Sequence, residues 1–432
     1  MTTHHVAIVG AGVAGVQTAE ELRRQGYAGR ISLISGEEHP PYDRPPLSKE
    51  YLTSASPELP LLRPEQSYVD HAIDLQLGVC VTAVDLADRA LTTGDGDRIR
   101  FDALVLATGS RARRLGSLPR TENVFYLRTL EDAVRLREAL RPGAEVVIAG
   151  GGFIGLEVAA AARALGNAVT VVQMDGAPLA PVIGENLGRV VQRLHEQRGV
   201  TVLTGESVIG VVGDPMVREV ATSGGLRLPC DVLVVGVGAE PADELAAAAG
   251  LAVDSGILVD PSCRTSAPGV YAVGDVARHD HPVHGRIRVE HWDVARRQAA
   301  TAAAGILGRE EACTTLPWFW SDQYEFNFQY IGHAQGWDDV VVRGDVDAMQ
   351  FTAFFCRDGR VEGAFGTGRP REIRPAGRLV ATRSVLPREL LADPEVDLRR
   401  MTETTKSAEA AQARSPVVVA DRGGPCTERD LR

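Results

Sequence analysis

The 432-residue sequence predicts an α/β protein that contains two copies of one strand–helix–strand unit and ends in a smaller α+β domain. The copies are "HVAIVGAGVAGVQTAEELRRQGYAGRISLIS" at residues 5–35 and "EVVIAGGGFIGLEVAAAARALGNAVTVVQ" at residues 145–173. Each contains a short apolar run, a glycine turn, apolar residues at helical spacing and a second apolar run. From Pro317 onward, aromatic-rich segments joined by turns such as "RDGR" indicate antiparallel strands instead.

The first unit carries the glycine pattern of a dinucleotide-binding turn. Gly10, Gly12 and Gly15 form G-x-G-x-x-G between a predicted strand and a predicted helix, and the acid Glu37 follows. The first glycine permits a tight turn, the second lets the backbone approach a pyrophosphate, and the third lets the helix pack closely on the strand. A purely structural glycine turn is the alternative interpretation.

The second unit repeats this pattern with Gly150, Gly152 and Gly155. Two such sites in one chain predict two dinucleotides. The simplest pair is one flavin and one nicotinamide nucleotide, because that pair supports hydride transfer. The second strand of this unit ends in Gln173, where an acid would normally bind a ribose hydroxyl.

Further predicted strands follow the two units and end in small residues, at residues 101–110 and 230–241. Another strand, within residues 265–278, runs into Gly274 and Asp275. The Asp275 carboxylate could accept a hydrogen bond from a sugar-alcohol hydroxyl. On its own, a Gly-Asp pair predicts only a turn.

The loop "PPYDRPPLSKEY", residues 40–51, contains four prolines and the cations Arg44 and Lys49. Proline fixes the backbone φ angle and so stiffens the loop. A stiff loop that holds a lysine is a candidate cofactor clamp. The alternative, which the residues alone favour, is an ordinary surface loop.

The segments after Pro317 have a different residue pattern from the two strand–helix–strand units. "DDVVVRGD" at residues 338–345 and "MQFTAFFCRDGRVEGAFG" at residues 349–366 predict antiparallel strands, and helical patterns continue to about residue 400. Residues 401–432 lack periodicity and predict a mostly disordered tail. Within it, "PVVVA" at residues 416–420 could instead dock as a strand.

Composition and charge exclude several kinds of partner. The net charge of −11 argues against nucleic acid, because phosphate binding needs a basic face. No apolar run approaches the roughly 18 residues of a membrane span. None of the six cysteines forms a CxxC pair, so we predict no structural zinc site and no close-spaced dithiol. Small buried thiols and a first strand that begins at residue 5 are typical of a cytoplasmic protein.

Eight stretches of the sequence together carry a family resemblance. They are "GAGVAGVQTAEELR", "EEHPPYDRPPLSKEYL", "FDALVLATGS", "YLRTLEDAVRLR", "GGGFIGLEVAA", "RTSAPGVYAVGDVAR", "VEHWDVARRQ" and "PWFWSDQY". From residue 4 to about residue 400, the chain resembles the oxygenase-coupled NADH:ferredoxin reductases, which are glutathione-reductase-like flavoproteins. The loop around Lys49 and the "WSDQY" stretch are the most specific matches.

The resemblance implies two Rossmann-like dinucleotide-binding domains and a C-terminal domain. FAD would lie in a domain formed by residues 1–112 and 245–316. NAD(H) would lie in the inserted domain, residues 113–244. Residues 317–400 would form the C-terminal α+β domain, which covers one side of the flavin.

The resemblance also implies which residues contact the cofactors. The positions that match FAD contacts are Gly10, Gly12, Gly15, Glu37, Arg44, Lys49, Val81, Ala107, Thr108, Gly109, Arg128, Gly274, Asp275, His291 and Trp292. The positions that match NAD(H) contacts are Gly150, Gly152, Ile154, Gly155, Glu157, Gln173, Asp175 and Gly238.

Two of these residues have an implied catalytic role. Lys49 matches a lysine near the flavin N5 atom, where a fixed ammonium stabilises the charge that a hydride brings. Glu157 matches an acid that pairs with this lysine and keeps it protonated, since a buried lysine without a carboxylate tends to lose its proton. The alternative for Glu157 is an acid in the first turn of a helix, where the helix dipole favours it.

The resemblance implies a protein electron acceptor. Disulfide reductases of this fold carry a CxxxxC pair in the region that the proline-rich loop fills here, so electrons must leave for an external acceptor. In this family the acceptor is usually a [2Fe–2S] ferredoxin or a rubredoxin. Arg369, Arg371 and Arg374 could steer such an acidic protein, or could belong to a solvated helix face with structural ion pairs.

We therefore expect an FAD-dependent oxidoreductase that passes electrons from NAD(P)H to an iron–sulfur protein and so supplies an oxygenase. NADH should be preferred, because no cation follows Gln173 between residues 174 and 188 to meet a 2′-phosphate. Gln173 should weaken NADH binding, with partial compensation by Asp175. The alternatives are a flavin oxidase or modifying enzyme that acts on a small molecule, and a non-catalytic flavin redox sensor.

Overall fold

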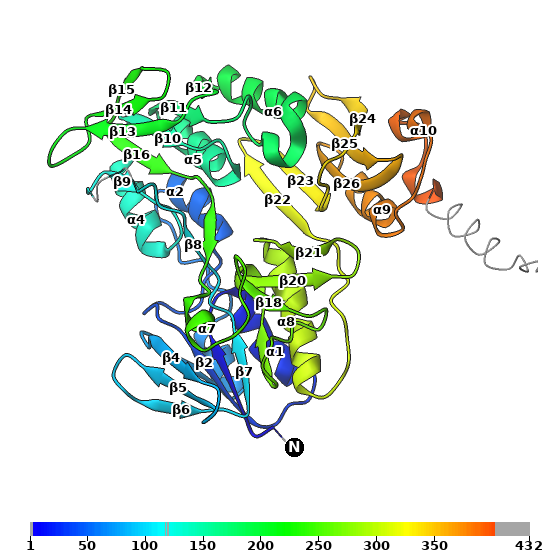
Figure 1. The fold of residues 1–432 in the computed structure, drawn as a ribbon. Coiled ribbons are helices and arrows are strands. Elements are labelled where there is room, and N and C mark those ends of the chain that lie inside the picture. The colour runs from blue at the N-terminus through cyan, green and yellow to red at the C-terminus, as the bar shows by residue number, and fades with distance from the viewer. Residues whose placement is uncertain (1–2, 117, 119–120, 402–432) are drawn as a thin grey trace, which may run out of the picture.

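The computed structural model describes residues 3–116, 118 and 121–401. Figure 1 shows one sheet near the N-terminus, a second sheet at the upper left and a third at the upper right. Of the predicted tail only Met401 is described, and it is buried in the C-terminal core. The predicted disorder of residues 402–432, and the alternative strand within them, lie outside the described residues.

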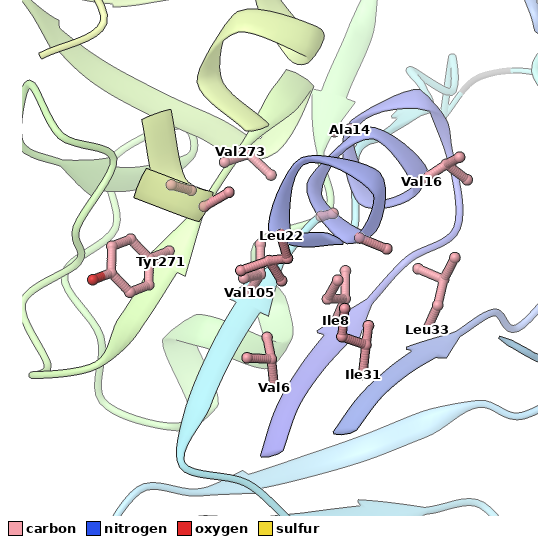
Figure 2. Packing of buried hydrophobic residues seen from close by; sticks show 14 of the residues in the cluster. Val6, Ile8, Ala14, Val16, Leu22, Ile31, Leu33, Val105, Tyr271 and Val273 are labelled. Carbon is pink, nitrogen blue, oxygen red and sulfur yellow. The ribbon is translucent and has the colours of Figure 1, made fainter. Parts of the chain in front are cut away.

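The first sheet has five parallel strands. In spatial order they are β19 (Val270–Ala272), β7 (Ala103–Leu106), β1 (His5–Val9), β2 (Arg30–Ile34) and β3 (Ile73–Gln76). Helices α1 (Val13–Arg24) and α8 (Trp292–Ile306) pack together over one face. Figure 2 shows Ala14, Val16 and Leu22 of α1 close to Val6, Ile8, Ile31 and Leu33 of the strands.

The other face of the first sheet is also covered. Alternate strand residues such as Ala7, Val9 and Leu104 contact α7 and two small sheets. These elements are α7 (Glu244–Ala248), β4 (Val81–Asp85), β5 (Ala90–Thr93), β6 (Arg98–Arg100), β18 (Ile257–Val259), β20 (Ala277–His281) and β21 (Gly285–Arg288). Burial on both faces explains why the strands are continuous apolar runs.

The second sheet repeats the arrangement. Its five parallel strands are β12 (Val200–Thr204), β11 (Ala168–Gln173), β10 (Glu145–Ala149), β16 (Val232–Val235) and β9 (Val124–Phe125). Helices α4 (Leu130–Ala139) and α5 (Phe153–Ala164) cover one face. The other face packs on an antiparallel sheet of β13 (Val208–Val212), β14 (Glu219–Thr222) and β15 (Arg227–Pro229).

The proline-rich loop crosses from the first sheet to the second. Its helical turns are η1 (Pro45–Ser48) and α2 (Glu50–Thr53). Leu47 and Leu52 are almost fully buried in the hydrophobic cluster that α4 and α5 form. This packing anchors both sides of Lys49 beside α5, so the loop is not an ordinary surface loop.

The C-terminal sheet is antiparallel, as predicted. Its strands are β22 (Trp318–Gln323), β23 (Phe326–Gly332), β26 (Arg360–Thr367), β25 (Gln350–Arg357) and β24 (Asp339–Asp345). One face packs on α6 (Ala180–Gln197) and the first turn of α5. The opposite face packs on α9 (Pro370–Ala381) and α10 (Arg388–Ala392).

Smaller elements complete the described chain. They are α3 (Glu65–Asp70), η2 (Gly274–Val276) and an antiparallel pair of β8 (Ser110–Ala112) and β17 (Ala239–Pro241). No helix in the described ranges is long and apolar enough to cross a membrane. The predicted α/β class, with two dinucleotide-binding sheets and a C-terminal α+β region, is confirmed.

Candidate flavin and nicotinamide site

A cavity of about 1250 Å³ is lined by both glycine turns, the proline-rich loop and β22. Small-molecule sites usually have volumes of roughly 300–1,000 Å³. This cavity is larger, and the two turns reach it from different sheets. It can therefore admit two ligands that meet inside it.

Most of the predicted contact residues line this cavity. From the flavin set these are Gly10, Gly12, Glu37, Arg44, Lys49, Val81, Ala107, Thr108, Gly109, Arg128, Gly274, Asp275, His291 and Trp292. From the nicotinamide set these are Gly152, Ile154, Gly155, Glu157 and Gly238. The predicted residues that do not line the cavity are Gly15, Gly150, Gln173 and Asp175.

The first glycine turn fits a pyrophosphate. A Cβ atom on Gly15 would lie 1.9 Å from the carbonyl oxygen of Gly10, so only glycine lets α1 pack this closely on the turn. No atom lies within 4 Å of a Cβ built on Gly12, which leaves open space there. Gly12 is also the N-cap of α1 and offers no side-chain cap, so the helix N–H groups can receive an anion.

The second glycine turn has the same construction. Gly150 has φ +106°, and a Cβ atom there would lie 2.4 Å from the carbonyl oxygen of Gly236. A Cβ atom on Gly155 would lie 2.1 Å from the carbonyl oxygen of Gly150. Gly152 is the N-cap of α5 and likewise lacks a side-chain cap. Gly150 and Gly155 thus shape the turn, while Gly152 borders the cavity.

Glu37 lies three residues after β2, and both of its carboxylate oxygens accept hydrogen bonds. Tyr42 Oη donates to Oε2 at 2.5 Å, and Arg44 Nη2 donates to Oε1 at 2.6 Å. Burial raises the pKa of Tyr42, so this hydroxyl stays a donor. Arg44 Nη1 also donates to the carbonyl oxygen of Arg128 at 2.6 Å. The network fixes Glu37 at the position where a ribose is expected.

Asp275 has one oxygen free to face a ligand. Its Oδ2 atom accepts from Ser110 Oγ and from Arg128 Nη2, both at 2.8 Å. Its Oδ1 atom accepts no hydrogen bond from the described residues. A cavity-lining carboxylate with a free oxygen fits the predicted contact with a sugar-alcohol hydroxyl.

Two aromatic residues follow at the start of α8. Trp292 Nε1 donates to Asp43 Oδ1 at 2.8 Å, and burial raises the pKa of Asp43. The buried Nδ1 atom of His291 has no hydrogen-bond partner among the described residues. Burial also lowers the pKa of His291 to about 3, so the ring is neutral. A neutral ring nitrogen without a partner at the cavity wall fits a polar atom of a bound group.

Lys49 lies where the cavity meets α5 and β22. Its Nζ atom is 3.5 Å from Glu157 Oε1 and 3.2 Å from Asp322 Oδ2. The same atom lies 5.4 Å from the centre of the Trp320 ring. The Lys49 side chain is 10% exposed, so its charge acts in a largely desolvated setting.

Glu157 is held more firmly than by Lys49 alone. Ser48 Oγ donates to its Oε2 atom at 2.5 Å, and Ser321 Oγ donates to its Oε1 atom at 2.6 Å. Burial raises the pKa of Glu157, while Lys49 and the two hydroxyls oppose that shift. Glu157 lies beyond the first turn of α5, which contains no acid. The alternative based on the helix dipole is therefore wrong.

Gln173 differs from its prediction. Its Oε1 atom accepts a hydrogen bond from the backbone N–H of Gly151 at 2.7 Å. Its Nε2 atom donates to Asp175 Oδ2 at 2.6 Å. The side chain is 8% exposed and holds the glycine turn in place. The carbonyl oxygen is therefore not available to a ribose hydroxyl in this arrangement, and Asp175 is tied to the amide.

Of the three arginines predicted to steer an acidic partner, one forms a structural ion pair and two are exposed. Arg369 Nη2 donates to Glu372 Oε1 at 2.6 Å, so this arginine is a structural ion-pair partner. Arg371 and Arg374 are exposed.

One cysteine differs from the prediction of buried thiols. Cys80 is exposed and borders the cavity.

Several residues of the site were not predicted. They are Tyr42, Asp43, Ser48, Trp320, Ser321 and Asp322. All belong to the two stretches that are most specific for the family, the proline-rich loop and "WSDQY". The signal was present in those stretches, but only the folded structure brings their side chains together.

Comparison with known proteins agrees with this geometry. Residues 4–299 match the family described as pyridine nucleotide-disulphide oxidoreductase, and residues 318–402 match the one described as reductase C-terminal. The chain is 40% identical over 408 residues to the ferredoxin reductase component of chlorobenzene dioxygenase from Cupriavidus sp. (strain PS12), covering 94% of this chain and 99% of that protein.

Two further relatives extend the comparison. The ferredoxin–NAD(+) reductase subunit of the benzene 1,2-dioxygenase system from Pseudomonas putida is 39% identical over 400 residues, covering 92% of this chain and 97% of that protein. The crystal structure of the covalent putidaredoxin reductase–putidaredoxin complex matches with a TM-score of 0.89 and 36% identity, covering 94% of this chain and 99% of that chain. The resemblance inferred from the motifs is confirmed, and the chain belongs to the pyridine nucleotide-disulphide oxidoreductase family.

Proposed function

We propose that this protein is an FAD-dependent reductase that takes electrons from NADH and passes them to a [2Fe–2S] ferredoxin or a rubredoxin, which supplies an oxygenase. One observation carries the proposal. The two glycine turns border a single cavity, and the Lys49–Glu157 pair lies at its wall. The relatives named above, which are ferredoxin reductase components, support the same activity.

The residues of the first sheet would hold FAD. Gly12 and the N-terminus of α1 would bind the pyrophosphate, Glu37 the adenosine ribose and Asp275 the sugar-alcohol chain. Gly152 and the N-terminus of α5 would bind the NADH pyrophosphate. FAD, when bound, accepts electrons as a pair from NADH and releases them singly.

The proposal also assigns domain boundaries. The FAD domain comprises residues 1–112 and 245–316, the NAD(H) domain residues 113–244, and the C-terminal domain residues 317–400.

Lys49 supplies a fixed positive charge to the reaction. A charge that is already in place when negative charge develops stabilises the transition state without further reorganisation. Glu157 places an opposite charge beside the Lys49 ammonium in its largely desolvated position. Ser48 and Ser321 orient the carboxylate for this contact.

The proposal extends to the partner and the compartment. The protein acceptor would approach the C-terminal domain, where Arg371 and Arg374 on α9 offer exposed positive charge. The reductase would work in the cytoplasm, where the thiols stay reduced.

Anaerobic mixing of the FAD-loaded protein with NADH tests the function. Rapid bleaching of the flavin absorbance, followed by reduction of an added [2Fe–2S] ferredoxin, is the expected result. Bleaching by an organic substrate but not by NADH would identify an oxidase. Slow reduction to a long-lived charge-transfer complex, without ferredoxin reduction, would identify a redox sensor.

A further inference from the structure

A buried chain of hydrogen bonds runs from Glu157 into the contact between α6 and the C-terminal sheet. Ser321 Oγ donates to Glu157 Oε1 at 2.6 Å, and Gln323 Nε2 donates to Ser321 Oγ at 3.1 Å. Gln323 Oε1 lies 2.9 Å from His195 Nε2, and His195 Nδ1 lies 3.2 Å from Tyr324 Oη. Ser321, Gln323 and His195 are all fully buried.

All the hydrogen bonds in this chain run in the same direction, from donor to acceptor. An ionised Glu157 can only accept, so Ser321 must donate to it. Ser321 in turn accepts from the Gln323 amide, which leaves the Gln323 carbonyl to accept from His195 Nε2. His195 is then protonated on Nε2 alone, and its Nδ1 atom accepts from Tyr324. Every donor in the chain points toward the carboxylate of Glu157.

The state of His195 agrees with this direction. Burial lowers the pKa of His195 to about 4, so the ring is neutral and has one donor nitrogen and one acceptor nitrogen. Tyr324 has a backbone φ of +55°, an uncommon angle for a bulky residue, in the turn that carries its hydroxyl to His195. Aligned donors polarise one another, so the chain strengthens its last bond to Glu157.

We propose that Ser321, Gln323 and His195 are positioning residues for electron transfer from NADH, because they keep Glu157 ionised and aimed at Lys49. The inference rests on the proposed function, in which the Lys49–Glu157 pair serves the reaction. It also gives the C-terminal domain a part in that reaction, since β22 and α6 belong to different domains of the proposed arrangement.

The charged groups around Glu157 do not by themselves keep it ionised, so the chain of hydrogen bonds is needed as well. Lys49 reaches it from the loop after η1, and Asp322 lies on the same strand as Ser321. Asp322 acts against ionisation of Glu157 and also binds the Lys49 ammonium, at 3.2 Å compared with 3.5 Å for Glu157. Burial acts against ionisation as well. The donors from Ser48 and Ser321 are therefore needed in addition to Lys49.

Ser321→Ala and Gln323→Leu test the proposal in the FAD-loaded protein. The infrared band of a protonated carboxyl group, assigned to Glu157 by its loss in Glu157→Gln, gives the pH midpoint directly. We expect Ser321→Ala to raise this midpoint by about one pH unit, because it removes a hydrogen bond to the charged group. Gln323→Leu acts through Ser321 and should raise the midpoint by less. Stopped-flow reduction of the variants by NADH should be several-fold slower below the variant's infrared midpoint and should recover above it. Ser321→Thr keeps the hydroxyl and should restore the wild-type midpoint.

Arg198→Gln is the matched control. The Arg198 side chain pairs with Glu325 and lies over the Tyr324 ring at the same α6 contact, but it donates no hydrogen bond to Ser321, Gln323 or His195. This variant should leave the infrared midpoint unchanged. An unshifted midpoint in both test variants, or an equal shift in Arg198→Gln, would overturn the inference alone. Failure of NADH to reduce the wild-type flavin would instead refute the proposed function.

Discussion

At the scale of single residues, Lys49 has the most direct consequence for the reaction. Lys49→Gln keeps a hydrogen-bond donor, on a side chain one atom shorter, but removes the charge beside Glu157. Loss of one preorganised electrostatic group costs roughly 100-fold in rate or more. We expect the rate of flavin reduction by NADH to fall about 100-fold. Stopped-flow absorbance measures this rate, and the flavin released on denaturation verifies that FAD is still bound.

Asp322→Asn is the control for Lys49. Asp322 is the more exposed of the two Lys49 partners, at 44%, and exposed ion pairs contribute little. The same rate should therefore change by less than about fivefold. A Lys49→Gln rate that stays within this range would contradict a catalytic role for the ammonium.

A second residue-scale prediction follows from the hydrogen bonds of Gln173 to Gly151 and Asp175. A glutamate at this position would still accept the Gly151 N–H, but its second oxygen would face the carboxylate of Asp175. Gln173→Glu alone should therefore leave the KM for NADH unimproved. The double variant Gln173→Glu/Asp175→Asn removes the repulsion and should lower the KM about fivefold, because a charged acceptor binds a ribose hydroxyl more strongly.

Steady-state kinetics with NADH and NADPH measure this effect. Asp175→Asn alone separates the contribution of the second site. A lower KM for Gln173→Glu without the second change would contradict the importance of Asp175. NADPH as the better donor in the wild-type protein would contradict the NADH preference itself.

At the scale of elements, two glycines of the first strand–turn–helix unit have different roles: Gly15 allows α1 to pack on the turn, and Gly12 leaves room for FAD. Gly15→Ala would place a methyl group 1.9 Å from the Gly10 carbonyl oxygen, and backbone cannot easily move aside. We expect a loss of about 1–3 kcal/mol in the free energy of unfolding, which urea titration measures. Gly12→Ala meets no atom within 4 Å and should fold normally while retaining less FAD. Equal destabilisation by both substitutions would contradict the distinction.

Helix α9 makes the second element-scale prediction. Arg371 and Arg374 are exposed, whereas Arg369 is paired with Glu372 and is left unchanged. Arg371→Glu/Arg374→Glu should slow reduction of an added [2Fe–2S] ferredoxin roughly tenfold at low salt, because complementary charge mainly raises association rates. Ferricyanide reduction should be unaffected. Arg141→Glu, an exposed arginine after α4, is the control, and equal loss with ferricyanide would refute docking on α9.

At the scale of the whole molecule, local patterns predicted local structure. The two strand–helix–strand units have the predicted order because apolar period and glycine spacing are properties of short segments. Contacts between distant segments were not predictable in this way. Ser48 and Ser321 meet at Glu157 only because the proline-rich loop packs under α4 and α5 and β22 packs on α5. Gln173 turns inward because Gly151 offers it an N–H, which no pattern in the sequence reveals.

Buried histidines make the stability of the whole molecule depend on pH. Burial lowers the pKa of His195 and His284 to about 4 and that of His291 to about 3. In an unfolded chain a histidine has a pKa of about 6.5. Between about pH 6.5 and pH 4 the unfolded chain therefore binds protons that the folded chain does not. These histidines do not reduce the free energy of unfolding above about pH 6.5, and they reduce it increasingly as the pH falls toward 4.

His284→Phe tests this dependence at one position. The buried Nε2 atom of His284 has no hydrogen-bond partner in the described chain, and its ring lies 5.0 Å from His281 and 5.9 Å from His333. Urea midpoints should show the wild-type protein losing about 1–2 kcal/mol more than the variant between pH 7.5 and pH 5. His71→Gln replaces an exposed histidine and should follow the wild type. If His284→Phe loses stability with the same pH slope as the wild-type protein, His284 is not among the groups that resist protonation in the fold.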